Sequence, residues 1–392
     1  MPSQQGTLSQ PQAPRPQPAV RAPEALRELL ARADVHINGT RPWDMRINHP
    51  RAYHRILTQW SLGAGESYVD GDWDCERLDM MFERLLRAEL DRTAPAAARL
   101  KVLLESLRQR LFNLQTVSRA HQVGERHYDA GNDVFEAMLD SRMIYSCAYW
   151  AHAQTLEQAQ EHKLEMICRK LELKAGETLL DIGCGWGGMA RFAAERYGVR
   201  VTGVTISKEQ LALAEQRCAG LPVTLLLQDY RSLKGRFDKV VSVGMFEHVG
   251  LKNYATYFDT ARRLLAPDGL FLLHTIGVDR RAPHTDPWIE RYIFPNGKLP
   301  SPVEMAGAIE GRFIVEDWHN FGPDYDHTLM AWAGRFDAAW PELANRYDEG
   351  FRRMFRYYLL SCAGFFRSRQ GQLWQLVLSG QQRRGAYRSV RP

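Results

Sequence analysis

An acidic residue followed by alternate glycines stands out near the middle of the 392-residue chain. Asp181 ends an apolar run, and Gly183, Gly185 and Gly187 follow it at every second position. Glycine tolerates positive φ and lets backbone N–H groups approach a ligand closely. The Asp181 carboxylate can accept hydrogen bonds from an ammonium or another polar edge of that ligand. The segment is therefore typical of a loop that binds a nucleotide-type cofactor.

Two cofactors compete for this loop. The first two glycines with Gly188 satisfy G-x-G-x-x-G, the dinucleotide fingerprint, whereas the acid with its three glycines satisfies D-x-G-x-G-x-G, the first motif of S-adenosylmethionine-dependent methyltransferases. A dinucleotide site requires an acid about 20 residues later, at the end of the next strand. The strand expected over 200–207 ends instead in the hydroxyls of Thr205 and Ser207. We therefore expect S-adenosylmethionine; a glycine-rich turn without a ligand is the third interpretation.

Polar residues also follow the next two expected strands. Thr205, Ser207 and Gln210 follow the second strand and open a helix. Gln228 and Asp229 end the third strand, where methyltransferases usually bind the adenine edge. Each group alone is more often turn or capping chemistry than a ligand contact. Three such groups at successive strand ends, in this order, favour a cofactor site.

An aromatic and polar stretch upstream could form a lid over the cofactor. Tyr145 and Ser146 could bond the methionine carboxylate, and aromatic faces could flank the sulfonium cation. For the polar residues over 127–133, helix capping by Asn132 or Asp133 is the alternative interpretation. The expected cofactor contacts are Tyr145, Ser146, Asp181, Gly183, Gly185, Trp186, Gly187, Thr205, Ser207, Gln210, Gln228 and Asp229.

The elements that must position these residues alternate between strands and helices. A helix is expected to open at Thr155, which begins a T-x-x-Q capping pattern, and to run to about Leu173. The alternation predicts an α/β fold, a class I methyltransferase (Rossmann-like) sheet that is mostly parallel with helices on both faces. Its last strand should be inserted antiparallel. The expected strands are 178–182, 201–205, 223–228, 237–243, 270–275 and 373–378.

Three regions precede the catalytic domain, which we expect over 119–392. Residues 1–22 are rich in Gln and Pro and should be a disordered tail. Residues 23–92 predict a small N-terminal α+β domain, and 93–118 predict a hinge and connecting helix. Within the small domain we expect helices from Pro23, near 51–60 and over 78–90, with short alternating runs at 35–37 and 45–47.

Composition limits the cellular context and the cofactor. The formal net charge of +5 says little about partners, and the six cysteines show no paired spacing, which favours free thiols in a reducing cytoplasm. No secretory signal begins the chain and no run approaches about 18 apolar residues, so we expect a soluble, cytoplasmic protein. A metal site formed by Glu247, His248 and His274 is conceivable, but their spacing does not require one and we expect none.

Eight motifs in the second domain together resemble the cyclopropane-fatty-acyl-phospholipid synthases. The resemblance runs from about Leu26 to Ser379 and includes SLGAGESYVDGDW of the first domain. Mycolic-acid modifying enzymes share the second domain but lack the first, so the bacterial phospholipid branch fits better. The eight motifs, in chain order, are HYDAGND, YSCAYW, LDIGCGWGG, GVTIS, GMFEHVG, HTIG, YIFPNG and EDWHNFGPDYD.

The resemblance implies an enzyme that transfers a methylene from S-adenosylmethionine to the cis double bond of a phospholipid acyl chain, through a carbocation. A bound bicarbonate would be the base that deprotonates it. Glu247 would accept a hydrogen bond from the bicarbonate O–H, His274 and Tyr325 would donate, and Cys147 would be a small polar wall. The implied bicarbonate ligands are Cys147, Glu247, His274, the backbone of Ile276, and Tyr325.

The C-terminal segment bears on the expected membrane partner. Residues 350–392 contain nine arginines and no Asp, Glu or Lys, with aromatic residues between them. Such a run suits anionic headgroups, although we expect most of the aromatic side chains in the core. No nucleic-acid motif accompanies the charge. We therefore expect a peripheral enzyme at the inner face of the membrane. The resemblance implies a homodimer and, for the first domain over 23–92, a role in lipid docking or dimerisation.

Three alternatives remain at this point. A fatty-acyl C-methyltransferase would use the same carbocation but give a methyl-branched product. A small-amine N-methyltransferase would not need the bicarbonate ligands or the first domain. A non-catalytic lipid-binding relative would not need an intact glycine loop together with all five implied ligands.

Overall fold

The computed structural model describes residues 21–92, 131–282 and 285–391. Three expectations therefore lie outside the described residues: most of the N-terminal tail, the hinge and connecting helix over 93–118, and the first residues of the 127–133 motif. All the structural statements below concern the described ranges.

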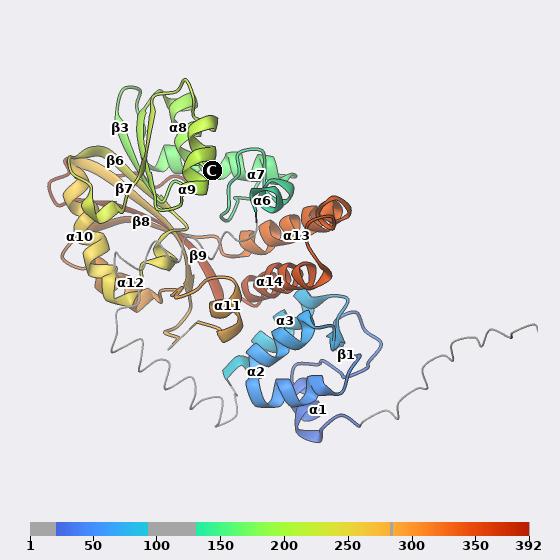
Figure 1. The fold of residues 1–392 in the computed structure, drawn as a ribbon. Helices are drawn as coiled ribbons and strands as arrows, with labels where there is room; N and C mark the ends of the chain where they lie inside the picture. Colours follow the sequence, from blue (N-terminus) through green and yellow to red (C-terminus); the bar gives the residue numbers. More distant parts are fainter. Residues whose placement is uncertain (1–20, 93–130, 283–284, 392) are drawn as a thin grey trace, which may run out of the picture.

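A seven-stranded sheet forms the centre of the larger part of the molecule (Figure 1). The strand order is β5-β4-β3-β6-β7-β9-β8; β3 to β7 run parallel, and β9 lies antiparallel between β7 and β8. The expected class I methyltransferase sheet, with its antiparallel last strand, is confirmed. The strands are β3 (Thr178–Ile182), β4 (Arg200–Thr205), β5 (Val223–Leu227), β6 (Phe237–Val243), β7 (Leu265–Val278), β8 (Ile314–Asn320) and β9 (Gly371–Ser379).

Strand β8 was not expected from the sequence, where its residues belong to a polar motif. It is an edge strand that pairs with β9 alone, and its register shifts between Val315 and Asp317. Ile314 and Val315 are exposed, while Asp317 is buried. The regular alternation that identifies a half-buried strand is therefore missing.

Helices cover both faces of the sheet because alternate strand residues point to opposite sides. Leu180 of β3 packs in a cluster with Tyr257 and Phe258, whereas its neighbour Leu179 packs with Ile167 and Ala193 on the other face. The surrounding helices are α6 (Asn132–Met138), α7 (Leu156–Lys170), α8 (Gly188–Tyr197), α9 (Lys208–Arg217), α10 (Tyr254–Leu264), α11 (Pro287–Tyr292), α12 (Pro302–Ile309), α13 (Pro323–Leu343) and α14 (Glu349–Arg367), with 3₁₀ turns η2 (Tyr230–Ser232), η3 (Phe246–His248) and η4 (Leu251–Asn253).

The N-terminal unit is formed by three helices and one short antiparallel strand pair. The expected end of the second helix near Trp60 is confirmed, because α2 consists of two helical stretches separated by the non-helical Trp60, where φ is 54° and ψ is −126°. The stretch over 61–69 was not expected; it contains Gly63 and Gly65, and glycine lowers helix propensity. The elements are α1 (Glu24–Ala31), β1 (Arg46–Ile47), α2 (Arg51–Val69), β2 (Trp73–Asp74), α3 (Leu78–Arg87) and the turn η1 (Leu90–Arg92).

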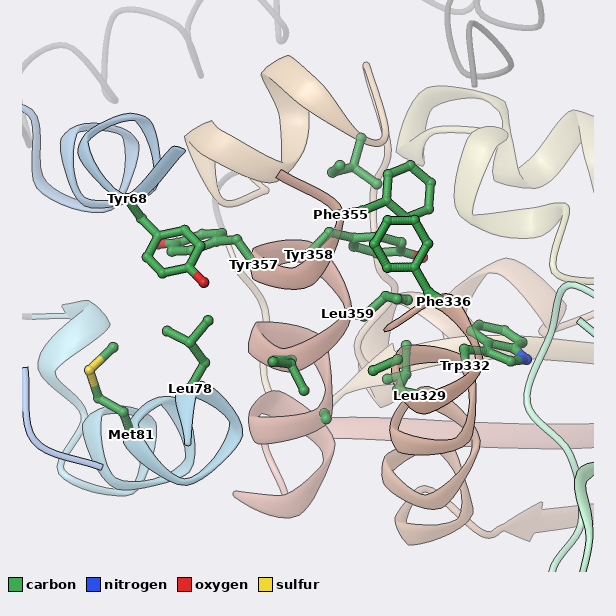
Figure 2. Close-up of a cluster of buried hydrophobic side chains, with 14 of the residues drawn as sticks. Tyr68, Leu78, Met81, Leu329, Trp332, Phe336, Phe355, Tyr357, Tyr358 and Leu359 are labelled. Carbon is green, nitrogen blue, oxygen red and sulfur yellow. The ribbon is translucent and has the colours of Figure 1, made fainter. Parts of the chain in front are cut away.

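Helix α14, near the end of the chain, packs between this unit and the rest of the molecule (Figures 1 and 2). On one side Tyr357 meets Tyr68 of α2 and Phe82 of α3, with ring centroids 5.4 and 5.2 Å apart. On the other side Phe355 stacks on Phe336 of α13 at 5.2 Å. Side chains separated by about 280 positions in the chain therefore share one hydrophobic cluster.

The arginine-rich C-terminal segment is largely neutralised within the protein. Six of its nine arginines form ion pairs with carboxylates of other elements or turns, so most of this charge is compensated within the protein, and the expectation that it faces lipid stays a prediction. Burial of most of the aromatic side chains is confirmed. No helix in the described ranges is long and apolar enough to cross a membrane. The six are Arg352, Arg353, Arg356, Arg367, Arg383 and Arg391.

Candidate active site

One cavity of about 1530 Å³ extends from the carboxyl ends of the parallel strands to apolar side chains of the N-terminal unit. Ser207 and Gln228 line it beyond β4 and β5, and Leu26 and Leu30 of α1 line it in the N-terminal unit. Nearly all the expected site residues contribute to its wall. The exceptions are Cys147, Gly187 and His274.

The glycine loop joins β3 to α8 in a conformation that side chains disfavour. Gly183, Gly185 and Gly187 all have positive φ, of 84°, 54° and 80°. A Cβ on Gly187 would lie 3.0 Å from the Cys218 sulfur and 3.2 Å from the Ala214 Cβ. Gly187 therefore starts α8 and lets α9 approach, while Gly183 and Gly185 line the cavity.

Asp181 at the end of β3 is buried and incompletely bonded. Its side chain lines the cavity, the residue is 1 % exposed, and Oδ2 has no hydrogen-bond partner among the described residues. Burial raises the pKa of this carboxyl to about 7. An unpaired buried acceptor is costly, so Asp181 is poised to accept a hydrogen bond from a ligand in the cavity.

The residues after β4 combine capping with cavity lining. The Ser207 hydroxyl accepts from the Gln210 backbone N–H at 3.3 Å and so caps α9. Thr205 Oγ1 lies 3.1 Å from Gln210 Oε1 and donates to it. The capping interpretation of this segment is therefore correct for Ser207. The same three side chains also line the cavity.

After β5, the Asp229 carboxylate is bound by a neighbouring guanidinium. Arg231 donates to both oxygens, at 2.9 and 2.6 Å, and the Arg231 backbone N–H adds a third bond at 2.9 Å. Gln228 donates from Nε2 to Ser232 at 2.8 Å. These bonds fix Asp229 and Gln228 in the cavity wall, so their orientation is set before any ligand binds.

The expected lid is held in place by aromatic contacts from three helices. The hydroxyls of Tyr145 and Tyr358 are 2.7 Å apart, and the Tyr145 ring packs against Phe135 and Trp332 at 5.1 and 5.2 Å. The capping interpretation of Asn132 and Asp133 is wrong, because neither side chain caps α6. Instead they anchor other residues: Asn132 accepts from Trp186 Nε1 at 3.2 Å, and Asp133 from Tyr347 and Arg346 at 2.9 and 2.7 Å.

Sequence reasoning missed Lys163, which lines the cavity from α7. Its Nζ donates to the Ser146 hydroxyl at 2.9 Å, and the residue is 1 % exposed. One turn earlier, Gln160 donates to the carbonyls of Ile144 and Ser146 at 3.3 and 2.9 Å. The available signal was two polar residues on the otherwise apolar face of a predicted helix, at positions i and i+3.

Glu247 lies in η3, immediately beyond the end of β6. Its Oε1 accepts from the Ile276 backbone N–H at 2.8 Å, and its backbone carbonyl accepts from the Lys298 N–H, also at 2.8 Å. Oε2 is buried and has no partner among the described residues. Burial raises the pKa of this carboxyl to about 7.

His274 lies on β7, two residues before Ile276 and therefore on the same face of the sheet. The amide nitrogen of Gln375 on β9 is 3.2 Å from its Nδ1. Because an amide nitrogen donates, Nδ1 accepts and the proton is assigned to Nε2. Nε2 is buried without a partner in the described ranges. Burial lowers the pKa of His274 well below its usual value, so the ring is a neutral donor.

Cys147 and Tyr325 pack beside β7 in a small cluster that contains Phe321 and the side chain of Ile276. Cys147 is fully buried, which raises the pKa of its thiol well above the usual value. The Tyr325 ring packs on Phe366 at 4.5 Å, and burial likewise raises its pKa. Both groups therefore stay protonated. No group of three or more His, Cys, Asp or Glu able to bind a metal ion occurs among the described residues.

Comparison with known proteins identifies the family. Residues 115–376 match the family model described as Mycolic acid cyclopropane synthetase. The chain is 58% identical over 352 residues to the cyclopropane-fatty-acyl-phospholipid synthase of Escherichia coli (strain K12), covering 90% of this chain and 92% of that one. It is 34% identical over 354 residues to the tuberculostearic acid methyltransferase UfaA1 of Mycobacterium tuberculosis (strain ATCC 25618 / H37Rv), covering 85% and 82%.

A solved structure agrees with the fold and the cofactor. The mycolic acid cyclopropane synthase CmaA1 complexed with SAH and CTAB matches with a TM-score of 0.62 and 33% identity, over 66% of this chain and 98% of that one. SAH is the demethylated product of S-adenosylmethionine. Sheet topology, glycine loop and sequence identity therefore agree, and the chain belongs to the cyclopropane-fatty-acyl-phospholipid synthase family of class I S-adenosylmethionine-dependent methyltransferases.

Proposed function

We propose that this enzyme forms a cyclopropane ring at the cis double bond of a phospholipid acyl chain, with bound bicarbonate as the base. The observation that carries the proposal is one continuous cavity, which connects the glycine loop to a long apolar wall. Binding of S-adenosylmethionine alone would require only the polar end of this cavity. The apolar remainder suits a hydrocarbon chain, because each buried methylene contributes about 0.8 kcal/mol.

The apolar wall comes from the N-terminal unit as well as from the catalytic part. An isolated alkene is a weak nucleophile, and its attack on a methyl group leaves a carbocation that water would trap. Side chains of α1, α2 and α3 that close the cavity against water therefore belong to the chemistry, not only to docking. They include Leu26, Leu30, Ile56, Met81, Phe82, Leu85 and Leu86.

The donor and acceptor set around β7 suits bicarbonate. Glu247 Oε2 is a buried acceptor and His274 Nε2–H a buried donor, and neither has a partner in the described part of the chain. A small oxyanion with one O–H can satisfy both. Bound there, bicarbonate would supply the base for ring closure. Glu247 would orient it by accepting from its O–H, and Tyr325 would add a second donor.

The backbone of Ile276 has a second role beside its expected contact with bicarbonate. Its N–H donates to Glu247 Oε1 and so fixes that carboxylate. Cys147 fills the wall behind the site as a neutral thiol. Aromatic faces such as Tyr145 and Tyr325 line the same cavity and can stabilise positive charge on the acyl chain by about 0.5–2 kcal/mol each.

The runner-up is a fatty-acyl C-methyltransferase with a methyl-branched product. It is favoured by the 34% identity, over 85% of this chain, to an enzyme named tuberculostearic acid methyltransferase. Both products would arise from one carbocation, so binding experiments cannot separate them. The structure of the product can.

The proposal includes peripheral action at the cytoplasmic face of the membrane, as a homodimer. Support for this part comes from family membership and from the substrate, because a phospholipid must be reached in a bilayer. The mostly neutralised arginine segment gives it little additional support.

The substrate class can be tested with purified full-length protein and S-adenosylmethionine in buffer containing bicarbonate. Vesicles of cis-monounsaturated phospholipid are compared with vesicles of the trans isomer and with the free cis fatty acid. We expect ring formation with the cis phospholipid and little with the other two. Turnover of the free acid but not of the vesicles would contradict the phospholipid substrate.

A further inference from the structure

Two oppositely charged side chains are buried beside the glycine loop and line the same cavity. Lys163 on α7 and Asp181 at the end of β3 are each 1 % exposed. Each favours the charged form of the other, although no ion pair within 4.0 Å joins them, and Asp181 Oδ2 has no hydrogen-bond partner among the described residues. Each charge therefore retains unused hydrogen-bonding capacity in a place where water is scarce.

Asp140 is the first charge that favours the ammonium form of Lys163, but no direct ion pair joins the two side chains. Asp140 uses its oxygens to accept from the backbone N–H groups of Arg142 and Ile144, both at 2.9 Å. The hydrogen bond that Lys163 does make, to Ser146 Oγ at 2.9 Å, satisfies one of three ammonium protons. A buried ammonium with so few partners is unfavourable, which indicates that the protein retains it for a ligand.

The bond between Lys163 and Ser146 also sets the direction of the hydroxyl proton. An ammonium has no acceptor capacity, so Ser146 Oγ must accept in this bond. The Ser146 O–H is then directed elsewhere, as a donor. Lys163 and Ser146 together offer donors, and Asp181 offers an acceptor, at the polar end of the cavity.

The methionine part of S-adenosylmethionine carries a carboxylate and an ammonium group on the same α-carbon. We propose that Lys163 is a positioning residue that, with Ser146, binds the α-carboxylate of the cofactor, while Asp181 accepts from its α-ammonium. This inference rests on the proposed cofactor site and extends it to a residue outside the glycine motif. Burial lowers the pKa of Lys163 to about 8, and a bound carboxylate would offset that loss of charge.

Helix α7 supplies a matched control. Lys170, two turns further along, is fully buried, and burial lowers its pKa to about 8 as well. Its Nζ lies 3.0 Å from His319 Nδ1 and 3.4 Å from Asp317 Oδ2. It does not line the cavity. Both lysines lie on α7, are buried and have a lowered pKa, but of the two only Lys163 lines the cavity.

The test uses calorimetric titration of full-length wild type, Lys163→Met and Lys170→Met with two ligands. S-adenosylhomocysteine has the amino-acid part, and 5′-methylthioadenosine lacks it. We expect Lys163→Met to bind S-adenosylhomocysteine at least tenfold more weakly while its affinity for methylthioadenosine stays within twofold. Lys170→Met should leave the ratio of the two affinities unchanged.

Two outcomes would overturn the inference: equal loss of both ligands in Lys163→Met, or unchanged affinity for S-adenosylhomocysteine. If Lys163→Met does not fold, wild-type protein decides, because decarboxylated S-adenosylmethionine should bind at least tenfold more weakly than the intact cofactor. Equal affinities would overturn the proposal. Failure of the wild-type protein to bind S-adenosylhomocysteine would refute the cofactor site itself. If Lys163→Met is active and its affinity for S-adenosylhomocysteine is unchanged, only the role of Lys163 is refuted.

Discussion

The carboxylate of Glu247 accepts a 2.8 Å hydrogen bond from the backbone N–H of Ile276, which ties the turn beyond β6 to strand β7. One oxygen is thereby fixed, and the other is left buried without a partner in the described ranges. An amide in place of the carboxylate can keep the first bond while turning the free acceptor into a donor.

Glu247→Gln should therefore lose turnover and keep the fold. We expect kcat to fall by roughly 10²–10⁴-fold, the range for a positioned acid–base group. Affinity for S-adenosylhomocysteine should stay within twofold, because Glu247 is not among the cofactor contacts. Steady-state kinetics and calorimetry measure the two quantities, and turnover at the wild-type rate would refute the role assigned to Glu247.

Turnover should rise with pH through about 7. Burial raises the pKa of Glu247 to about 7, and the proposed role needs the ionised acceptor, so the acidic form is the inactive one. The pKa of His274 is depressed well below its usual value, so it stays neutral and adds no second step. The profile is measured at constant calculated bicarbonate and saturating cofactor, and a flat kcat between about pH 6 and about pH 8 would contradict the role.

Two helical glycines should respond oppositely to alanine. A Cβ on Gly364 of α14 would lie 2.6 Å from Phe82 Cβ and 2.7 Å from the Asp79 carbonyl, whereas one on Gly334 of α13 would meet nothing within 4 Å. Alanine in a helix interior is favoured over glycine by about 1 kcal/mol, and overpacking costs about 1–3 kcal/mol.

Denaturant unfolding should accordingly show Gly334→Ala more stable than wild type and Gly364→Ala less stable. Because Gly364 faces α3, the loss would report on contact between α14 and the N-terminal unit. A gain in stability for both variants would mean that the two helices do not pack this closely in solution.

Arg367 links the N-terminal unit to the catalytic part through two carboxylates. It donates to Asp79 of α3 at 2.5 Å and to Asp326 of α13 at 2.8 Å. Arg367→Met should destabilise the protein by about 3 kcal/mol, the low end for one partner of a buried pair, because Arg77 still pairs with Asp79. Hydrogen exchange in α3 should also increase.

The control for this change is Arg191→Met, which removes a partly exposed i,i+4 pair with Glu195. Such pairs contribute about 0.3–0.5 kcal/mol. Equal stability losses in the two variants would show that Arg367 is no more than a surface charge.

The central strands β3 and β7 were predictable because they are largely buried and contain apolar runs. Strand β8 was not, because it is an edge strand with a register shift and exposed Ile314 and Val315. The second helical stretch of α2, after the non-helical Trp60, was not predicted, because its Gly63 and Gly65 lower helix propensity.

The site residues also could be predicted from the sequence only in part. The glycine loop and the polar residues at strand ends have local signatures. Lys163 has only a weak one, its place beside Gln160 on the apolar face of a helix, because its importance depends on a bond to Ser146, 17 positions away. The nine arginines over 350–392 can be counted in the sequence. Their neutralisation by carboxylates such as Asp79 and Asp317 depends on the fold.

The most direct measurement uses S-adenosylmethionine with a fully deuterated methyl group and vesicles of cis-monounsaturated phospholipid. Mass spectrometry of the acyl chains then counts the deuterium in the product. The account predicts a ring-bearing chain that has lost one deuterium, because ring closure requires deprotonation of the incoming methyl. A methyl-branched chain that retains all three would contradict cyclopropane formation and favour the C-methyltransferase.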